Sequence, residues 1–244
     1  MGHALHGAVS IARSRVPAAF EALLRSAYRL DMLMDSCILV RATSFQVGGT
    51  VIEIHPKEIK GSWDEGYVLD VHTISSTMIG YNEFGHPEFD TVRSPLGELV
   101  YRLKYRGDKG AILSIVEAIT GFMKTCDINP NVVVPMPPSK LQRTFQPVIE
   151  VGTELAKALG ITFNATSLKK SKSTPQMKDV GDFSARVTTL EAAFVSDRDL
   201  EGRSVLVLDD LFQSGATMNV AARTLKRQGL VKSVYALALT RTRN

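Results

Sequence analysis

The apolar residues along this chain change their spacing twice, and each pattern predicts a different kind of structure. From Val9 to Met34 they recur at helical intervals, which indicates an amphipathic helix within residues 1–36. Over residues 37–93 the apolar runs are short or alternating, with Gly and Pro between them, as in β-strands joined by turns. We interpret this second segment as a small strand-rich cap, or hood, that precedes a larger domain over residues 94–244.

The larger domain alternates strands with helices. Ser94 and Pro95 predict a helix start, because Ser can cap the first amides and Pro suits the first turn. Val132 to Val134 and Ser204 to Leu208 have the continuous apolar character of buried strands, and helical patterns follow both. This order predicts an α/β fold, in which a parallel sheet has helices on both faces.

Composition narrows the class of protein. A net charge of +4, from 29 Lys and Arg against 25 Asp and Glu, is too mild to indicate nucleic acid as the main partner. The two cysteines, Cys37 and Cys126, can build neither a disulfide framework nor a four-cysteine zinc site. No apolar run approaches the roughly 20 residues of a membrane helix, and arginines interrupt the apolar start, unlike a secretory signal. We therefore expect a cytoplasmic protein with no membrane partner.

The most informative stretch joins a buried strand to a helix through two acids and a turn of small residues. Asp209 and Asp210 directly follow Leu208, so we expect both at the carboxyl end of a central strand, where open α/β sheets bind ligands. The following small-residue turn and helix start suit a phosphate, because backbone amides and the helix dipole both favour an anion there. The two acids must then face hydroxyl groups or a divalent cation on the same ligand. A sugar phosphate satisfies both requirements, and the alternative is that the acids only cap the turn.

This stretch resembles the phosphoribosyl-pyrophosphate signature of the type I phosphoribosyltransferases: an apolar strand, two acids, three variable residues and a small-residue loop that ends in Thr. The resemblance implies that Asp209 and Asp210 hold the ribose hydroxyls, and that Mg²⁺ is carried by phosphoribosyl pyrophosphate and not held by the protein alone. It also implies a loop that binds the 5′-phosphate, formed by Gln213, Ser214, Gly215, Ala216 and Thr217.

Other motifs resemble the ComF-type competence branch of that family. Leu103 to Asp108 is similar to the branch's Leu-Lys-Tyr-x-Gly-Asp motif, and Val132 to Pro138 is similar to its Val-Pro-Val-Pro strand end. The likeness covers residues 94–244, and nothing before Ser94 matches the branch's four-cysteine zinc ribbon. The implied reaction transfers the phosphoribosyl group to an unidentified nitrogenous acceptor and releases pyrophosphate.

Two alternatives to an enzyme stay open. In the first alternative, the chain would be a non-catalytic sensor of the same ligand or an accessory protein for DNA uptake, as the competence resemblance implies. A third interpretation has the lysine-rich residues 169–186 bind single-stranded DNA, with an affinity that falls steeply as salt rises. The sequence names no acceptor and leaves a homodimer open.

Hydroxyl and cationic side chains are the candidates for the pyrophosphate end of the ligand. Ser139 and Lys140 follow the first strand end, and we assign Lys140 a catalytic role beside the two aspartates. Residues 169–186 predict a lid that closes over the site, with a surface insertion as the alternative. For Lys104 and Arg106 the alternative is a solvated helix face or a salt bridge. The candidates for lid or pyrophosphate contacts are Lys104, Arg106, Arg143, Lys170, Lys172 and Arg186.

The cap carries the residues that would recognise the acceptor. His72 and His86 are candidates for this role, with structural histidines as the alternative. Four aromatic residues of the cap are better explained by packing than by stacking on a base: Trp63, Tyr67, Tyr81 and Phe84. Gln213 stands where relatives that salvage 6-oxopurines have an acid, which disfavours hypoxanthine or guanine as the acceptor.

Overall fold

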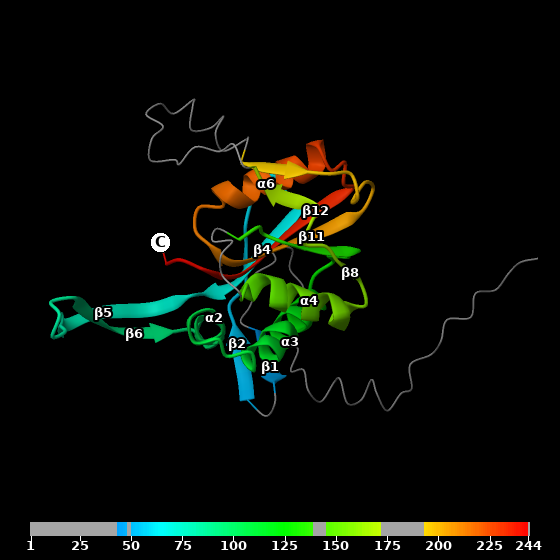
Figure 1. The fold of residues 1–244 in the computed structure, drawn as a ribbon. Coiled ribbons are helices and arrows are strands. Elements are labelled where there is room, and N and C mark those ends of the chain that lie inside the picture. The colour runs from blue at the N-terminus through cyan, green and yellow to red at the C-terminus, as the bar shows by residue number, and fades with distance from the viewer. Residues whose placement is uncertain (1–42, 48–49, 139–144, 172–192, 244) are drawn as a thin grey trace, which may run out of the picture. The chain divides into compact units, whose positions relative to one another are not determined.

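A six-stranded sheet, in the order β3-β4-β12-β11-β7-β8, forms the centre of the described structure (Figure 1). The structure is a computed structural model that describes residues 43–47, 50–138, 145–171 and 193–243. Strands β4, β12, β11, β7 and β8 run parallel, and the edge strand β3 pairs antiparallel with β4. The strands are β3 (Lys57–Glu58), β4 (Glu65–Val71), β7 (Val132–Pro135), β8 (Thr162–Phe163), β11 (Ser204–Phe212) and β12 (Ser233–Arg241).

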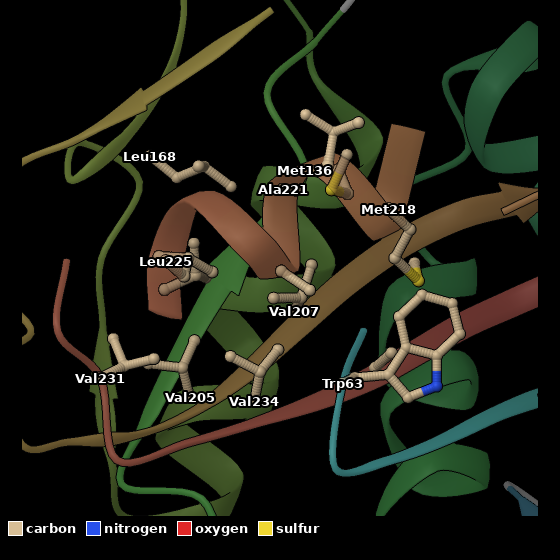
Figure 2. Close-up of a cluster of buried hydrophobic side chains, with 14 of the residues drawn as sticks. Trp63, Met136, Leu168, Val205, Val207, Met218, Ala221, Leu225, Val231 and Val234 are labelled. Carbon is tan, nitrogen blue, oxygen red and sulfur yellow. The ribbon is translucent and has the colours of Figure 1, made fainter. Parts of the chain in front are cut away.

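Helices cover both faces of this sheet, as predicted. On one face Val205 and Val207 pack with Leu225 in a buried apolar cluster beneath α6 (Figure 2). On the other face the ring of Tyr67 packs edge-on against Phe122 of α3, with centroids 5.1 Å apart. The helices are α2 (Pro95–Arg106), α3 (Ala111–Met123), α4 (Pro147–Leu159) and α6 (Ala216–Arg227). The α/β fold class, with a mostly parallel sheet between helices, is confirmed.

Helix α2 begins and ends where local chemistry predicts. The Ser94 hydroxyl accepts a hydrogen bond from the Gly97 amide at 3.0 Å, Pro95 occupies the first turn, and Gly107 ends the helix at φ 65°. Gly97 also allows a close approach, because a Cβ there would lie 2.2 Å from the carbonyl oxygen of His72. The helix therefore packs tightly against the end of β4.

The connections place a topological switch point between β7 and β11. From β7 the chain passes through α4 to β8 on one side, whereas from β11 it passes through α6 to β12 on the other. Since α4 and α6 cover opposite faces, the connections that leave the carboxyl ends of the neighbouring strands β7 and β11 turn to opposite sides of the sheet. Open α/β sheets bind ligands in the crevice at such a point.

The strand-rich character expected of residues 37–93 is present in their described part, but the division from the following domain needs correction. Strand β4 lies inside the central sheet, where it pairs with β12. Its residues 66–70 are all buried, so it suits a position covered on both faces, not a separate cap. The N-terminal helix expected over residues 1–36 lies outside the described residues.

Within the described residues, three further pairs of strands lie outside the central sheet. Strands β1 and β2 pair antiparallel, β5 and β6 form a hairpin, and the short β9 and β10 pair across residues outside the description. Their bounds are β1 (Thr43–Val47), β2 (Thr50–Ile54), β5 (Thr73–Tyr81), β6 (Pro87–Arg93), β9 (Leu168–Lys170) and β10 (Phe194–Ser196). Among the described helices, none has the length and apolar character needed to cross a membrane.

Candidate functional site

The acid pair, Asp209 and Asp210, lies where β11 emerges from the buried part of the sheet. The strand is buried from Val205 to Leu208 and partly exposed from Asp209 onward. Because β11 stays extended to Phe212, successive side chains point to opposite faces. The predicted position of both acids, at the carboxyl end of a central strand, is therefore found.

Asp210 forms a salt bridge with a lysine, and the charges of two lysines act on Asp209. The Asp210 Oδ2 lies 2.6 Å from Lys104 Nζ of α2, with both side chains largely buried. Asp209 is on the α6 face, since its register partner Ala238 belongs to the apolar cluster beneath α6. There the charge of Lys170, on β9, acts on Asp209. Two lysines from separate elements, Lys104 of α2 and Lys170 of β9, thus oppose the negative charge of the acid pair.

The electrostatics of the acid pair follow from this burial. Burial, followed by the negative charge of Asp210, raises the pKa of Asp209 to about 7. A hydrogen bond from the Asp210 amide to Asp209 Oδ1, at 2.8 Å, and the charges of Lys104 and Lys170 act in the opposite direction. Burial also lowers the pKa of Lys170, although Asp209 opposes this. Asp209 is therefore able to gain or lose a proton near neutral pH.

The glycine turn, residues 213–217, connects the acid pair to α6. Gly215 is the N-cap of α6, at φ 73°, and the amide of Ala216, the first residue of the helix, donates to the Ser214 hydroxyl at 3.4 Å. A Cβ on Gly215 would lie 2.7 Å from the ring of Phe212, so both the backbone conformation and the space require glycine. Gln213, Ser214, Ala216 and Thr217 are exposed. The residues on both sides of the buried Gly215 are therefore exposed to solvent beside the acids, at the helix N-terminus where an anion is favoured.

Asn219 braces the glycine turn, a role that the sequence does not reveal. Its Nδ2 donates to the Gly215 carbonyl at 3.0 Å, and its Oδ1 accepts from the Ser62 amide at 2.7 Å. The four-residue spacing of Gly215 and Asn219 is the one feature of the sequence that could have indicated the bond between them. The contact with Ser62, 157 residues away in the sequence, arises only from the tertiary fold.

A second group missed by the sequence interpretation supports the backbone of Asp210. The Thr240 hydroxyl donates to the Asp210 carbonyl at 2.9 Å, and His72 Nδ1 lies 3.2 Å from the same hydroxyl oxygen. Because the hydroxyl has one hydrogen, which Asp210 receives, it accepts from His72. His72 Nδ1 thus carries a proton, and in the neutral ring Nε2 is an acceptor.

The two candidate histidines occupy different environments. Burial, followed by the charges of Arg93 and Lys104, lowers the pKa of His72 and favours the neutral ring. His86 lies exposed at the turn of the β5–β6 hairpin. The structure therefore connects His72, and not His86, to the acid pair. Trp63 and Tyr67 are buried in the core, consistent with packing, whereas Tyr81 and Phe84 are exposed, so the packing prediction is wrong for these two.

The structure brings only some of the predicted cationic residues to the acids. Lys104 forms the salt bridge that the sequence left open as an alternative, and Lys170 acts on Asp209. Arg106 lies exposed at the end of α2, with its guanidinium 5.5 Å from the Tyr101 ring centroid. The remaining candidates lie outside the described residues: Ser139, Lys140, Arg143, Lys172 and Arg186.

The carboxylate oxygens of Asp209 and Asp210 are candidate ligands for Mg²⁺. Carboxylate oxygens are suitable ligands for Mg²⁺. Within the described residues, however, no three His, Cys, Asp or Glu side chains gather in a way that could hold a metal ion.

Comparison with known proteins links the chain to a competence protein. No protein-family model matches it. It is 27% identical over 160 residues to competence protein ComFC of Bacillus subtilis, across 62% of this chain and 62% of that protein's length. The chain is thus similar to a ComF-type protein, and the resemblance seen in the motifs is confirmed.

Solved structures with some similarity include phosphoribosyltransferases. Adenine phosphoribosyltransferase from Leishmania tarentolae is 12% identical, with 76% of this chain and 94% of that chain covered and a TM-score of 0.40. Glutamine phosphoribosylpyrophosphate amidotransferase from Bacillus subtilis is 16% identical, with 64% and 34% covered and a TM-score of 0.40. Such scores are too low to support a conclusion about the fold, which rests on the sheet order and connections.

Proposed function

We propose that this protein binds the Mg²⁺ complex of phosphoribosyl pyrophosphate and transfers its phosphoribosyl group to a nitrogenous acceptor. One observation carries the proposal: the acid pair and the solvent-open glycine turn lie together at the carboxyl end of β11, at the switch point of the sheet. Carboxylates suit sugar hydroxyls, and the amide end of α6 suits a phosphate. A ribose phosphate joins both groups in one ligand.

The alternation of β11 adds a constraint on how the ribose binds. The carboxylates of Asp209 and Asp210 leave the strand on opposite sides. A ribose therefore meets both only if it lies across the end of the strand, with its 2′ and 3′ hydroxyls directed to different carboxylates. Its 5′-phosphate then extends toward residues 213–217, where α6 begins after Gly215.

The proposed reaction is a displacement at the anomeric carbon. The acceptor nitrogen donates an electron pair to C1′, the bond from C1′ to the pyrophosphate oxygen breaks, and pyrophosphate leaves with that pair. An acceptor N–H proton passes to solvent or to a nearby base. Mg²⁺ bound to the diphosphate stabilises the charge of the leaving group. Lys140, Ser139 and Arg143 remain proposed pyrophosphate contacts, and Lys170, Lys172 and Arg186 remain proposed contacts from the loop.

Lys104 has a defined place in this scheme. Its ammonium balances Asp210 in the structure, 2.6 Å from the carboxylate. When the ribose hydroxyls satisfy Asp210, the ammonium becomes available to the diphosphate, which is the stronger anion. We therefore assign Lys104 a role in pyrophosphate binding as well as in holding the acid pair.

Isothermal titration with Mg²⁺ and phosphoribosyl pyrophosphate tests ligand binding directly. We expect heat for the natural protein, and none for a variant with Asp209→Asn and Asp210→Asn. A matched control, Asp199→Asn with Glu201→Gln, removes two exposed acids elsewhere and should bind normally. Absence of binding by the natural protein, or equal heat from the acid-pair variant, contradicts the proposal.

Pyrophosphate release across a panel of nucleobases and amines tests the transfer step. Release that requires both phosphoribosyl pyrophosphate and one acceptor supports an enzyme. The similarity to a competence protein favours a second candidate, a non-catalytic sensor of the same ligand or an accessory protein for DNA uptake. Tight binding without release for any acceptor in the panel would favour that candidate.

A further inference from the structure

One ring nitrogen of His72 has no partner at the carboxyl end of the sheet. His72 directly follows β4, and its amide donates at 2.8 Å to the carbonyl of Arg241, at the end of β12. The half-buried ring is held by the bond from Nδ1 to the Thr240 hydroxyl. Among the described residues, none forms a hydrogen bond with Nε2, and this nitrogen is not one of their buried polar atoms without a partner. Nε2 is therefore open to solvent and available to a ligand.

Two hydrogen bonds connect this ring to the acid pair. The Thr240 hydroxyl receives a hydrogen from His72 Nδ1 and donates its own to the Asp210 carbonyl, 2.9 Å away. Strand β12, which carries Thr240, lies between β4 and β11 (Figure 1). Since neighbouring strands are about 4.8 Å apart, the backbones of β4 and β11 are separated by roughly 10 Å, and the His72 side chain reaches into this interval. A ligand held by the acid pair therefore has Nε2 as a neighbour.

Charged groups from three elements act on the ring, and their balance favours its neutral form. Burial lowers the pKa of His72, and the positive charges of Arg93, on β6, and Lys104, on α2, lower this pKa further. The negative charges of Asp210, on β11, and Glu98, on α2, act in the opposite direction but do not overcome the decrease. The ring is therefore uncharged at neutral pH.

Two further charged side chains lie close to His72 along the strands, and both have other partners. Asp70 Oδ1, on β4, lies 3.5 Å from His55 Nδ1. The Arg243 guanidinium, beyond β12, donates to the carbonyl of Ile74. Neither side chain bonds to the His72 ring, so the lone pair of Nε2 is not occupied by either of them.

The chemistry of a neutral imidazole limits what Nε2 can bind. With the proton on Nδ1, Nε2 is a hydrogen-bond acceptor and a base. The phosphate and diphosphate groups of phosphoribosyl pyrophosphate present acceptor oxygens, which do not suit a second acceptor. The ribose hydroxyls are donors, but the proposed function assigns them to the carboxylates of Asp209 and Asp210. The donor that remains in the reaction is the N–H group of the nitrogenous acceptor.

We propose that His72 is the general base of the phosphoribosyl transfer and that its Nε2 binds the N–H group of an azole acceptor. This inference rests on the proposed function. The N–H bond of the azole breaks, its electron pair forms the bond from nitrogen to C1′, and its proton moves to Nε2. The bond from C1′ to the pyrophosphate oxygen breaks, and pyrophosphate leaves with that electron pair. The His72 imidazolium then releases the proton to solvent, which restores the neutral ring.

A base at this position specifies the class of acceptor. An azole such as imidazole or adenine carries a hydrogen on the nitrogen that reacts, and this hydrogen must leave during the transfer. A pyridine such as nicotinic acid reacts through a nitrogen that carries no hydrogen, so it gains nothing from a base. Because a positioned general base accelerates a reaction by about 10²–10⁴-fold, His72 favours azoles over pyridines.

Pyrophosphate release between about pH 5 and pH 9 tests the base, with imidazole, adenine and nicotinic acid as acceptors. For the natural protein, kcat/KM for an azole should fall in acid as His72 gains a proton, with a midpoint below the ordinary value of 6.5. His72→Asn keeps a donor for the Thr240 hydroxyl but supplies no base. Its kcat should fall at least about a hundredfold and lose the acid limb, while its affinity for Mg²⁺-phosphoribosyl pyrophosphate is kept. His86→Asn, a matched control at an exposed turn, should change none of these quantities.

Nitrogen NMR of the histidine rings gives a readout that does not depend on turnover. The natural protein is saturated with Mg²⁺, ribose 5-phosphate and pyrophosphate, and an acceptor is then added. Adenine should shift the Nε2 resonance of His72, because Nε2 accepts its N–H group, whereas nicotinic acid should not. This measurement and the pH profile of the natural protein use the unaltered chain, so they decide the inference even if His72→Asn fails to fold.

The results distinguish a failure of the base from a failure of the reaction. If His72→Asn releases pyrophosphate at the natural rate with the acid limb unchanged, or if adenine leaves the Nε2 resonance unmoved, His72 is not the base and the proposed function stands. If the natural protein releases no pyrophosphate with any acceptor, the transfer and the base are both overturned. Release with nicotinic acid but with neither azole would overturn the assigned class of acceptor.

Discussion

Lys104 and Asp210 come from elements far apart in the sequence and meet with 2.6 Å between Nζ and Oδ2. Asp210 lies two residues beyond the buried part of a central strand, and Lys104 is held over it by a helix whose Gly97 permits close packing on β4. The same carboxylate lies next to Asp209, whose pKa is raised to about 7 by burial and by the charge of Asp210. The lysine therefore keeps two adjacent acids compatible with the folded state.

Removing the Lys104 charge tests this role. Lys104→Met keeps most of the side-chain volume but leaves Asp210 without its ammonium. Because a largely buried carboxylate then lacks its partner, we expect the free energy of unfolding to fall by about 1–3 kcal/mol and the affinity for Mg²⁺-phosphoribosyl pyrophosphate to fall at least about tenfold. Urea unfolding and isothermal titration measure the two effects.

Lys157→Met is a matched control for that variant. Lys157 pairs with Glu154 on the surface of α4, with the two side chains 66% and 36% exposed. Surface pairs contribute about 0–1 kcal/mol, so this variant should keep both stability and affinity. Equal losses in the two variants would show that the Lys104 contact has no special role.

The raised pKa of Asp209 predicts how stability depends on pH. Since burial raises the pKa of Asp209 from 3.8 to about 7 in the folded protein, the unfolded chain releases this proton first as pH rises. The contribution of Asp209 is thus most favourable below about pH 4 and is lost progressively up to about pH 7. Asp209→Asn should remove this loss and raise the free energy of unfolding by about 2–4 kcal/mol above pH 7.

Urea unfolding of both proteins between pH 4 and pH 8 checks this prediction through the difference between their curves. The Asp209→Asn curve should rise above that of the natural protein as pH increases. Parallel curves would mean that Asp209 has the same proton affinity in the folded and unfolded chain. The substitution should also weaken ligand binding, because Asn lacks the carboxylate charge.

Gly215 offers a test of the glycine turn with a control in the same chain. Gly215 and Gly202 have similar φ angles, 73° and 70°. A Cβ added at Gly215 would clash with the Phe212 ring, whereas a Cβ added at Gly202 would have no neighbour within 4 Å. Gly202→Ala should lower the free energy of unfolding by about 1–2 kcal/mol through backbone strain alone and leave ligand affinity unchanged. Gly215→Ala should lower the free energy of unfolding by more than this, and it should also reduce the affinity for the 5′-phosphate, because the turn must shift.

Thermal unfolding and titration with ribose 5-phosphate measure these two effects. Ribose 5-phosphate presents the ribose and the 5′-phosphate without the diphosphate, so it reports on the acid pair and the glycine turn. If Gly215→Ala binds this ligand as well as Gly202→Ala does, the turn is not the phosphate site.

His72 should have its proton on Nδ1. The Thr240 hydroxyl donates its single hydrogen to the Asp210 carbonyl, so it must accept from the His72 ring. Nitrogen NMR of the imidazole distinguishes the two tautomers, and titration should give a pKa for His72 below its usual range, as burial, Arg93 and Lys104 require. A lowered pKa contributes stability above about pH 6.5 that is lost as pH falls through the folded value.

His72→Asn and His72→Leu separate positioning from packing. Asn can place a donor near Thr240, whereas Leu cannot. We expect Leu to weaken ligand binding more than Asn, since only Asn keeps the hydroxyl oriented toward Asp210. A proton found on Nε2 alone would contradict the hydrogen-bond arrangement.

Local patterns were sufficient to locate the helix starts and the main strands. Ser94 and Pro95 predicted the start of α2 because the capping bond is made within one helical turn. The acids after Leu208 were expected at a strand end because a continuous apolar run is typical of a central parallel strand. In contrast, β4 was assigned to a cap, since nothing in its own sequence specifies that β12 is its neighbour.

The sequence by itself determined the elements, their order and the chemistry at the end of β11, because these depend on side chains within a few residues of each other. Only the tertiary structure decided that Lys104 reaches Asp210, that Asn219 joins Ser62 to the glycine turn, and that His72 contacts Thr240. Such contacts depend on how elements pack, and packing places residues 100 or more positions apart within hydrogen-bonding distance. The pattern of residues along the chain does not specify which distant residues come into contact.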